Sequence, residues 1–532
     1  MSSSAAEAIR LFQSGRAAEA ESAARRLVAG DPRDAEALHL LGCIRAQAGA
    51  RDEALGFLDR ALAIDPRNGA FLINRGRVLL EAGRAGESAR DLQLALQVMP
   101  ASKAAQGQLG IVHNMLGVAL QREGRADEAI AHLKQALAIT PGLTGALVNW
   151  GNALETRGDL EGAREKYREA IRREPAMPQA WLNAASVDVD LGRNAQAREA
   201  YERVLAIDPG SADARYGLGL LDLREQRFGE GWDGYERRFD THPPQSTRRG
   251  PALHALEARD LDTGKRVAVW SEMGVGDQVL YSTLLPQLRE RAAHVVAEVD
   301  PRLLAAYRRS LPAIEFVARG DAIPPGSCDR QVGVGSLAQL MRRDSASFAR
   351  QPRALLLPDP ARVQAIRAQL GDGPHVAVSW RSLQAAVRAS RAARKSIALA
   401  QFAAMAAGAG ARLVDIQYGD VEAERAAFER EHPGVLVRIA GLDAFNDLEG
   451  VMAAISACGA VVTASNVTAH LAGALGVATT VVFRGPVSPF HYWDAVAGAR
   501  SLWYPSLTVA ANPARIPSTR VAPPSGPDLR PA

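Results

Sequence analysis

The stretch RDEALGFLDRALAIDP, residues 51–66, returns with changes as ADEAIAHLKQALAITP at 126–141 and as NAQAREAYERVLAIDP at 194–209. Each copy ends in a proline, and the full series is Pro32, Pro66, Pro100, Pro141, Pro175 and Pro209. These prolines are spaced by 34 residues, with one interval of 41. Proline ends a helix because it has no N–H to donate and disfavours helical geometry in the residue before it. A terminator at a fixed period therefore predicts one helical unit repeated along the chain.

Other positions keep the same register. A small residue recurs four positions before a large one, in the pairs Ala54 and Leu58, Ala129 and Leu133, Ala163 and Tyr167, and Ala197 and Tyr201. A bulky residue precedes glycine at Leu41-Gly42, Leu116-Gly117 and Trp150-Gly151. Small residues let two helices approach closely, and the bulky residue fills the space beside them. On these residues the region 1–240 resembles an all-α tetratricopeptide solenoid of about six repeats.

The resemblance implies a superhelix whose concave face holds an extended segment of a partner protein. A spacer or a dimer surface is the alternative for such an array. The single 41-residue interval inserts seven residues, which we expect to lengthen the helix between Ala101 and Leu116. The segment FGEGWDGYERRF, residues 228–239, is expected to form a last amphipathic helix that closes the solenoid, with its aromatic residues in packing roles.

Composition bounds the classes of function. The 532 residues carry 63 basic and 59 acidic side chains, a balance that disfavours a nucleic-acid partner. The three cysteines are far apart and suit a reducing compartment. The start of the chain has no signal-peptide pattern, and the longest apolar region, 455–483, is broken by Asn466 and His470. We therefore expect a cytoplasmic protein without a membrane span.

From residue 266 the rhythm changes to short β-branched runs between helical segments. The expected strands are RVAVWSE (266–272), HVVAEVD (294–300), IEFVAR (314–319), HVAVSW (375–380), RLVDIQ (412–417), VLVRI (435–439), AVVTAS (460–465) and TTVVF (479–483). Strand–helix alternation in two series predicts two Rossmann-like lobes, 266–371 and 372–507, with a cleft between them. A linker, 241–265, would precede the lobes, and a Pro-rich tail, 508–532, is expected to be disordered.

The loops after these strands should carry the chemistry, because ligands of such sheets lie beyond the strands' carboxyl ends. After the first strand, Gly274 and Gly276 permit a close backbone approach to a ligand, and Asp277 opens a helix. Asp277 is either a helix N-cap or a carboxylate acting as general base. Val279 occupies the place of the third glycine of a dinucleotide fingerprint, so a nicotinamide cofactor is disfavoured.

Two later loops have residues that could bind an anionic ligand. Arg394 and Lys395 follow the strand at 375–380, and they form either a solvated basic face or a phosphate contact. Asn466 caps a helix of small residues whose N-terminus suits a diphosphate, and His470 lies one turn into that helix. His470 is either a packing residue or a neighbour of the bound anion.

Together these stretches resemble the heptosyltransferase-like glycosyltransferases of the two-lobed GT-B fold, over residues 230–507. The matching pieces are EGWDGYERR, the GVGD loop, RKSI, DIQYGD (415–420), the TAHLAGALG helix and SLWYPSL (501–507). The protein O-GlcNAc transferases share the plan of repeats followed by GT-B at a greater distance. The relatives commonly have Asp-Thr where this chain has Ser465-Asn466.

The resemblance implies a role for each matching residue. It implies that Asp277 is the base that deprotonates the acceptor. It also implies that catalysis needs no metal, since cationic side chains and a helix terminus neutralise the charge of the donor diphosphate. The implied donor-binding residues are Gly274, Gly276, Arg394, Lys395, Gln417, Asn466, Thr468, His470 and Gly473.

The function so implied is an inverting transfer of sugar to a Ser or Thr hydroxyl of a protein held by the repeats. The nucleotide sugar is a substrate, and no cofactor is expected. Flagellin or another surface protein is a candidate acceptor by analogy. The alternative is a non-catalytic repeat scaffold whose GT-B region is degenerate and which mediates protein–protein interaction.

Overall fold

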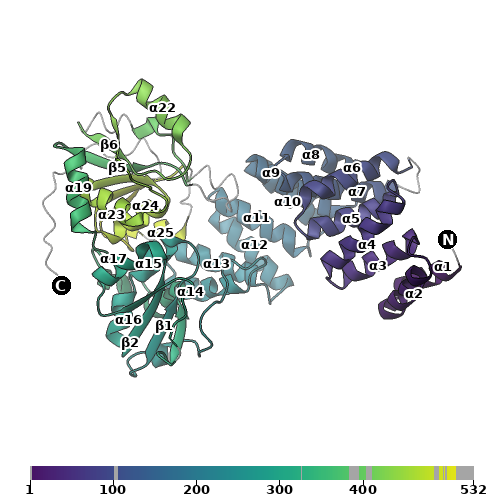
Figure 1. The fold of residues 1–532 in the computed structure, drawn as a ribbon, viewed down its shortest axis with the longest axis horizontal. Coiled ribbons are helices and arrows are strands. Elements are labelled where there is room, and N and C mark those ends of the chain that lie inside the picture. The colour runs from purple at the N-terminus through teal and green to yellow at the C-terminus, as the bar shows by residue number, and fades with distance from the viewer. Residues whose placement is uncertain are drawn as a thin grey trace. The chain divides into compact units, whose positions relative to one another are not determined.

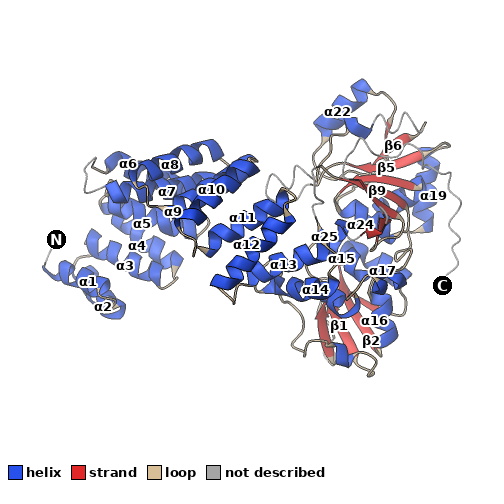
Figure 2. Cartoon of the chain, turned by 180° about the vertical axis from the view of Figure 1, so that it is seen from behind, coloured by secondary structure: helices blue, strands red, loops and turns tan. Residues whose placement is uncertain are grey.

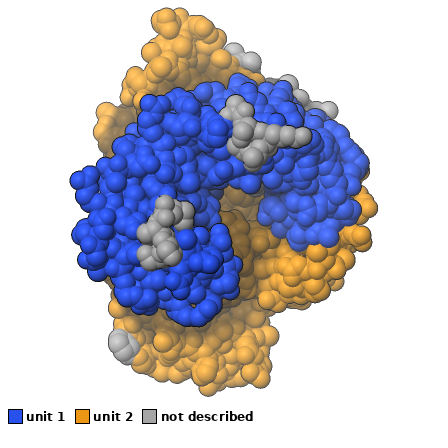
Figure 3. Space-filling view, turned by 90° about the vertical axis from the view of Figure 1, so that its right-hand side faces the viewer, with its two compact units in different colours: residues 1–187 blue, residues 188–532 orange. Residues whose placement is uncertain are grey.

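The computed structural model describes residues 3–100, 106–324, 326–382, 395–402, 410–484, 490–494, 496–497 and 500–510. The chain divides into two compact units, residues 1–187 and 188–532, which are coloured separately in Figure 3. Figure 1 follows the chain by colour from helices alone to helices mixed with strands. The change of secondary structure falls inside the second unit.

The first unit consists of consecutive helices that pack as hairpins. They are α1 (Ser3–Gln13), α2 (Ala17–Gly30), α3 (Ala35–Gln47), α4 (Arg51–Ile64), α5 (Gly69–Glu81), α6 (Ala85–Val98), α7 (Gln106–Arg122), α8 (Ala126–Ile139), α9 (Thr144–Arg157), α10 (Leu160–Arg173) and α11 (Pro178–Asp190). The last three residues of α11 belong to the second unit. Helices α2, α4, α6, α8 and α10 each end two residues before a proline of the periodic series, which confirms the predicted helix ends.

The glycines of the bulky-Gly steps lie where two helices touch. A Cβ atom at Gly42 would lie 2.6 Å from Leu58 Cγ, and one at Gly117 would lie 2.6 Å from Leu133 Cγ. At Gly151 it would lie 2.3 Å from Tyr167 Cε1. The predicted pairing of a small residue with a large one across each hairpin is therefore confirmed.

The long repeat interval has its counterpart in α7. This helix has 17 residues, whereas α3 and α5 have 13 each. The extra four residues are about one helical turn. The predicted lengthening is confirmed for α7, and residues 101–105 lie outside the described part of the chain.

The second unit begins with further helices, α12 (Asn194–Ile207), α13 (Ala212–Arg224) and α14 (Phe228–Tyr235), and a 3-10 turn η2 (Glu236–Phe239). The amphipathic helix expected at 228–239 is thus α14 with η2. Its buried Trp232 lies edge-on to Tyr281 and Trp503, with ring centroids 6.1 Å away from each. The aromatic residues therefore join the helix to the core of the α/β region.

The first sheet is parallel and has the order β3-β2-β1-β4. Its strands are β1 (Arg266–Trp270), β2 (His294–Val299), β3 (Glu315–Ala318) and β4 (Arg330–Gly333). The helices along this stretch are α15 (Val275–Ser282), α16 (Leu285–Arg291), α17 (Leu304–Ser310) and α18 (Leu337–Met341), with 3-10 turns η3 (Ala258–Asp260), η4 (Pro301–Leu303), η5 (Val334–Ser336) and η6 (Ala346–Arg350). Figure 2 shows both sheets in red with helices beside them.

The second sheet has the order β10-β11-β12-β9-β8-β5-β6-β7. Its strands are β5 (His375–Ser379), β6 (Arg412–Asp415), β7 (Leu436–Arg438), β8 (Ala460–Ala464), β9 (Ala478–Val482), β10 (Val496–Ala497), β11 (Arg500–Ser501) and β12 (Leu507–Ala510). The helices of this lobe are α19 (Pro360–Leu370), α22 (Glu422–Glu431), α23 (Leu448–Cys458), α24 (Val467–Ala474) and α25 (His491–Asp494). All strands from β12 to β7 pair in parallel.

The strand orders place the site. The parallel strands of the second sheet, numbered along the chain, run 3-2-1-4-5-6, which is the order of doubly wound dinucleotide folds. The first sheet runs 3-2-1-4. The order reverses between β5 and β8 and between β1 and β4, and ligands bind at the carboxyl ends of strands at such points. This region is therefore an α/β fold with one parallel sheet and one sheet that is parallel except at β10 and β11.

All eight strands predicted from the sequence are confirmed, and four were missed. The missed β4, β11 and β10 have few β-branched residues, and β12 lies at the start of the predicted tail. Since β12 pairs with β9 through Ala510, the sheet extends beyond residue 508, the start predicted for the disordered tail. Residues 511–532 lie outside the described part of the chain.

The predicted linker, 241–265, is packed against the first sheet. Ala255 forms a parallel bridge to Gln331 of the edge strand β4, and Leu256 N–H donates to the Gln331 carbonyl at 2.8 Å. Leu256 and Leu261 are both buried in the core of this lobe. The segment therefore extends the sheet edge as well as connecting the helices to the first lobe.

Candidate functional site

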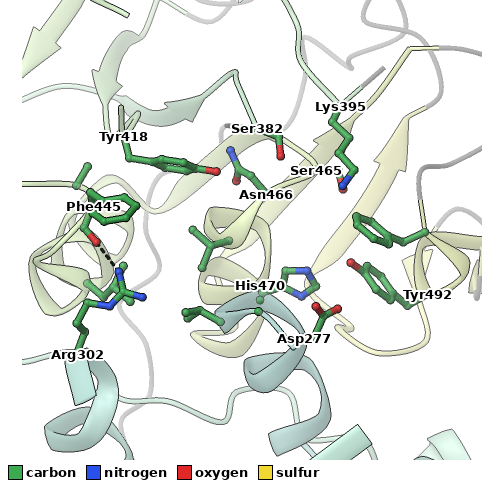
Figure 4. Close-up of a pocket in the computed structure, with 17 residues that line it drawn as sticks. Asp277, Arg302, Ser382, Lys395, Tyr418, Phe445, Ser465, Asn466, His470 and Tyr492 are labelled. Atoms are coloured by element: carbon green, nitrogen blue, oxygen red, sulfur yellow. Dashed lines mark hydrogen bonds between the residues drawn. The ribbon is translucent and has the colours of Figure 1, made fainter. Parts of the chain in front are cut away.

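A pocket of about 200 Å³ lies where the carboxyl ends of the two parallel sheets meet. Its lining comes from the segments after β1, β2, β5, β6, β7, β8 and β9, and the sequence predicted chemistry in the loops that follow strands. The lining residues are Gly274, Val275, Gly276, Asp277, Arg302, Ser382, Lys395, Tyr418, Ala444, Phe445, Leu448, Ser465, Asn466, Val467, His470, Phe490 and Tyr492. Figure 4 shows them as sticks.

Asp277 lies in the first turn of α15 with its carboxylate at one end of the pocket (Figure 4). Gly274 is the N-cap of that helix, so the N-cap interpretation of Asp277 was wrong. Burial raises the pKa of Asp277 to about 6, although a hydrogen bond from the Gly274 backbone and the charge of Lys395 oppose the rise. An aspartate with this pKa can hold or release a proton close to neutral pH.

The turn that carries Asp277 is strained and tightly packed. Met273 has a φ of 57°, a left-handed conformation that costs a residue with a side chain about 1–2 kcal/mol. A Cβ atom at Gly276 would lie 2.7 Å from His470 Cδ2. Only glycine therefore lets α15 approach α24 so closely, and this contact brings Asp277 beside His470.

Lys395 comes from the loop that follows β5, and this residue is 3% exposed. Its ammonium lies 4.0 Å from the centroid of the Phe490 ring, which itself stacks on Tyr492 at 4.9 Å. The charge of Lys395 acts on Asp277, so the two groups share one end of the pocket. Arg394, the other predicted cation, lies outside the described residues.

Asn466 is the N-cap of α24, as predicted, and its amide makes a full set of bonds. Its Oδ1 accepts from Thr468 N–H at 3.0 Å, and its Nδ2 donates to Ser379 Oγ at 2.8 Å and to the Arg381 carbonyl at 3.1 Å. An aspartate here could not donate either of the last two bonds. The neighbouring Ser465 Oγ accepts from Trp493 Nε1 at 2.9 Å. The departure from Asp-Thr therefore fits the surroundings of this pair.

His470 is buried among aromatic rings at the same end. Its Nδ1 lies 3.2 Å from Tyr504 Oη, and its ring stacks on Trp493 with centroids 5.1 Å apart. Burial lowers the pKa of His470 to about 3, so the imidazole is neutral at physiological pH. It lines the pocket as a polar but uncharged group.

Three predicted donor-binding residues do not line the pocket. Gln417 joins the ends of β5 and β6, because its Oε1 accepts from the backbone N–H groups of Trp380 and Arg381 at 2.7 and 2.8 Å. Thr468 is 1% exposed within α24. A Cβ atom at Gly473 would lie 2.5 Å from Tyr504 Cγ, which supports the predicted close packing at that glycine. All three residues support the walls of the site.

The other end of the pocket was not foreseen. Arg302 Nη1 donates to the Phe445 carbonyl at 2.8 Å, and the Phe445 and Tyr418 rings lie 6.4 Å apart. Figure 4 shows these three side chains across the pocket from Asp277. Tyr418 stands in the DIQYGD segment, which the sequence did single out. Arg302 and Phe445 are isolated in sequence, and their only signal is a place after a strand.

The pocket thus has two chemically different ends. One end holds a carboxylate that can take up a proton near neutral pH, a lysine and a neutral imidazole. The other end holds an arginine and two aromatic rings. Such an arrangement can pair with an anionic group through Lys395 and accept a proton through Asp277.

Tetratricopeptide repeat families match parts of the helical half. Residues 5–69, 110–143 and 154–215 match tetratricopeptide repeat families. The N-terminal half is a tetratricopeptide solenoid. Protein FlbA of Caulobacter vibrioides (strain ATCC 19089 / CIP 103742 / CB 15) is 31% identical over 264 residues, which cover 46% of this chain and 43% of FlbA. The chain therefore spans less than half the length of that relative.

Solved structures similar to this chain include other tetratricopeptide proteins. A tetratricopeptide repeat protein from Parabacteroides merdae ATCC 43184 is 18% identical, with a TM-score of 0.38 over 44% of this chain and 92% of that one. YrrB, described as having an unusual peptide-binding site, is 20% identical, with a TM-score of 0.30 over 37% and 98%. PilW, a type IV pilus biogenesis factor, is 21% identical, with a TM-score of 0.37 over 40% and 96%.

Two features are absent from the described residues. No helix in this part of the chain combines the length and apolarity that a membrane crossing needs. Among the same residues, no three His, Cys, Asp or Glu side chains are grouped so that they could hold a metal ion.

Proposed function

We propose that the second unit is a glycosyltransferase of the GT-B type, which moves a sugar from a nucleotide-sugar donor to a Ser or Thr hydroxyl of a protein bound by the tetratricopeptide solenoid. One observation carries the proposal. Asp277 with a pKa of about 6 and the buried Lys395 share a pocket at the points where both parallel sheets reverse their strand order.

In this reaction the acceptor hydroxyl oxygen attacks the anomeric carbon, and its proton passes to Asp277. The bond from the anomeric carbon to the diphosphate breaks, and the nucleotide diphosphate leaves with the electron pair. Attack from the face opposite the leaving group inverts the anomeric centre. Lys395 and the N-terminal end of α24 meet the growing negative charge, so electrostatic stabilisation comes from the protein's own groups.

The repeats supply the protein acceptor in this scheme. Tetratricopeptide arrays stack into superhelices with extended concave binding surfaces, which suit a polypeptide segment. Recruitment of a protein would raise the concentration of its hydroxyl groups near the pocket without any specific contact to the reacting residue.

One observation favours a non-catalytic scaffold as the second candidate. The Asn466 side chain already occupies the Thr468 amide at the start of α24, so this N–H is not offered to a diphosphate. A scaffold of this kind would bind partners through its repeats and would use the pocket, if at all, to sense a nucleotide sugar.

A thermal-shift panel of nucleotides and nucleotide sugars distinguishes the two candidates. We expect at least one nucleotide sugar to raise the melting temperature of the full chain, and Lys395→Ala to lose most of that shift. Lys265→Ala is the matched control, because Lys265 does not line the pocket. An unshifted wild-type protein with every compound would favour the scaffold, and an equal shift in Lys395→Ala would contradict the phosphate role.

A further inference from the structure

A fully buried ion pair lies beneath the strained turn of the pocket. Arg238, from η2, donates through Nε and Nη2 to the two carboxylate oxygens of Glu272 at 2.9 and 2.8 Å. Both side chains are 0% exposed. Burial by itself would lower the pKa of Arg238, but the Glu272 carboxylate more than offsets this, so the pKa of Arg238 is raised. The Arg238 guanidinium therefore keeps its charge within the protein core.

Glu272 is held by other parts of the lobe as well. Ser246 Oγ donates to its Oε2 at 2.9 Å, and Gly335 N–H donates to its Oε1 at 3.0 Å. A Cβ atom at Gly333 would lie 2.6 Å from Oε1, so only glycine at this position leaves room for the carboxylate. Four donors from three separate segments thus fix one side chain.

The turn of Asp277 starts from this fixed point. Glu272 directly precedes Met273, the residue with a φ of 57°, and the Met273 carbonyl accepts from Arg319 Nη1 at 3.1 Å. The next residue, Gly274, is the N-cap of α15, and Asp277 lies in the first turn of that helix. A strained turn persists only where its surroundings hold it in place.

We propose that Arg238 is a positioning residue, which through Glu272 fixes the turn 272–276 and so places the Asp277 carboxylate in the pocket. The inference rests on the proposed function for its consequence in catalysis. A competing explanation is that the pair contributes only to the overall stability of the lobe. The two explanations differ in whether the turn loosens when the pair is removed without loss of the fold.

Hydrogen exchange measured by mass spectrometry on the full chain separates them. Arg238→Met alone leaves an uncompensated buried carboxylate, so the test uses the double variant Arg238→Met with Glu272→Met, because replacing both partners of a buried pair by apolar residues is often tolerated. We expect peptides covering 271–281 to exchange at least 10-fold faster, while peptides covering β2 exchange as in the wild type. Ser246→Ala, which removes one bond to Glu272, should raise exchange of 271–281 by a smaller factor. Wild-type exchange at 271–281 in both variants would overturn the proposal, as would equal acceleration throughout the lobe.

A second readout applies if the protein transfers sugar. The charge of Glu272 contributes to the raised pKa of Asp277, so the acid limb of the rate profile should move to lower pH in the double variant. An unmoved acid limb would contradict the positioning role even if stability changed. The exchange measurement does not require an active enzyme. It therefore tests whether the ion pair fixes the turn 272–276 even if the protein transfers no sugar.

Discussion

Asp277 and His470 line the same end of the pocket, and burial shifts both groups toward their neutral forms. Burial raises the pKa of Asp277 to about 6 and lowers that of His470 to about 3. Loss of hydration disfavours whichever form is charged, which explains the opposite directions. At pH 7 the pocket therefore contains one ionised carboxylate near its pKa and one neutral imidazole.

Asp277→Asn should stabilise the protein at neutral pH while abolishing transfer. The native state favours the protonated carboxyl between the ordinary pKa of 3.8 and about 6, so wild-type stability falls as the pH rises through that window. The variant lacks this loss, and we expect its free energy of unfolding to exceed that of the wild type by about 1–3 kcal/mol at pH 7.5 and to match it near pH 4. Urea unfolding followed by tryptophan fluorescence at both pH values measures the difference.

The same pKa governs the rate. Wild-type transfer should fall as the pH drops through about 6, because the protonated carboxyl cannot accept the hydroxyl proton. Equal unfolding free energies at pH 7.5 would contradict the raised pKa of Asp277. A pH-independent rate in Asp277→Asn equal to the wild-type rate would remove Asp277 from the role of base.

Asn466→Asp tests the departure from the Asp-Thr pattern. The new carboxylate can still accept from Thr468 N–H, so the helix cap is kept. It has no N–H group to donate, so the bonds to Ser379 Oγ and to the Arg381 carbonyl are both lost. We expect a loss of about 1–3 kcal/mol in unfolding free energy, the usual cost of an unsatisfied buried group. Asp34→Asn is the matched control, because Asp34 caps α3 only by accepting from Ala37 N–H, and it should change stability by less than about 0.5 kcal/mol. A neutral Asn466→Asp would mean that the carboxylate is tolerated at this position.

The sequence predicted which loops form the pocket better than it predicted which side chains point into it. Asp277, Lys395, Asn466 and His470 follow strand ends, and the structure brings all four to one pocket. Gln417 also follows a strand end, yet its amide turns back to bond the Trp380 and Arg381 backbones. No pattern in the sequence predicts the direction of the Gln417 side chain, because that direction depends on which backbone groups are left unpaired after folding.

Among the elements, the hairpins of the solenoid were the most predictable. Each repeat requires two helices that pack closely and end at fixed positions. This requirement explains the spacing of the prolines, the pairing of a small residue with a large one, and the positions of the helix ends. The turns between the helices carry a further signal of the repeat. Glycines with positive φ recur there at the spacing of the prolines, at Gly15, Gly49, Gly83, Gly124, Gly158 and Gly192. By contrast β4, RQVG, is short and polar, so only its place in the parallel sheet identifies it as a strand.

Two glycines of α7 give a matched test of hairpin packing. A methyl group at Gly117 would lie 2.6 Å from Leu133 Cγ, whereas one at Gly107 would meet nothing within 4 Å. Gly117→Ala should therefore cost about 1–3 kcal/mol through overpacking. Gly107→Ala should be neutral or stabilising by up to about 1 kcal/mol, because alanine favours the helix. Denaturant unfolding followed by circular dichroism measures both, and equal effects at the two sites would contradict close packing at Gly117.

On the scale of the whole molecule, the proposed donor pocket and most of the tetratricopeptide solenoid lie in different units. All residues that line the pocket belong to residues 188–532, and the second unit has its own core of strands, helices and aromatic rings. The part of the solenoid within residues 1–187 has separate cores of its own, built from helix hairpins. Such a division predicts that donor binding and acceptor recognition can be removed independently.

Residues 188–532 expressed without the first unit should bind the donor as the full chain does. We expect the same thermal shift with the active nucleotide sugar, because the truncation removes no pocket residue. Transfer to the protein acceptor should fall at least 100-fold in kcat/KM, since the bound acceptor segment supplies the effective concentration of its hydroxyl groups. Donor hydrolysis by water serves as the internal control and should be unchanged. If the truncated chain modified the acceptor as efficiently as the full chain, the first unit would have no part in choosing the substrate. Loss of the thermal shift as well would mean that the donor pocket depends on the first unit.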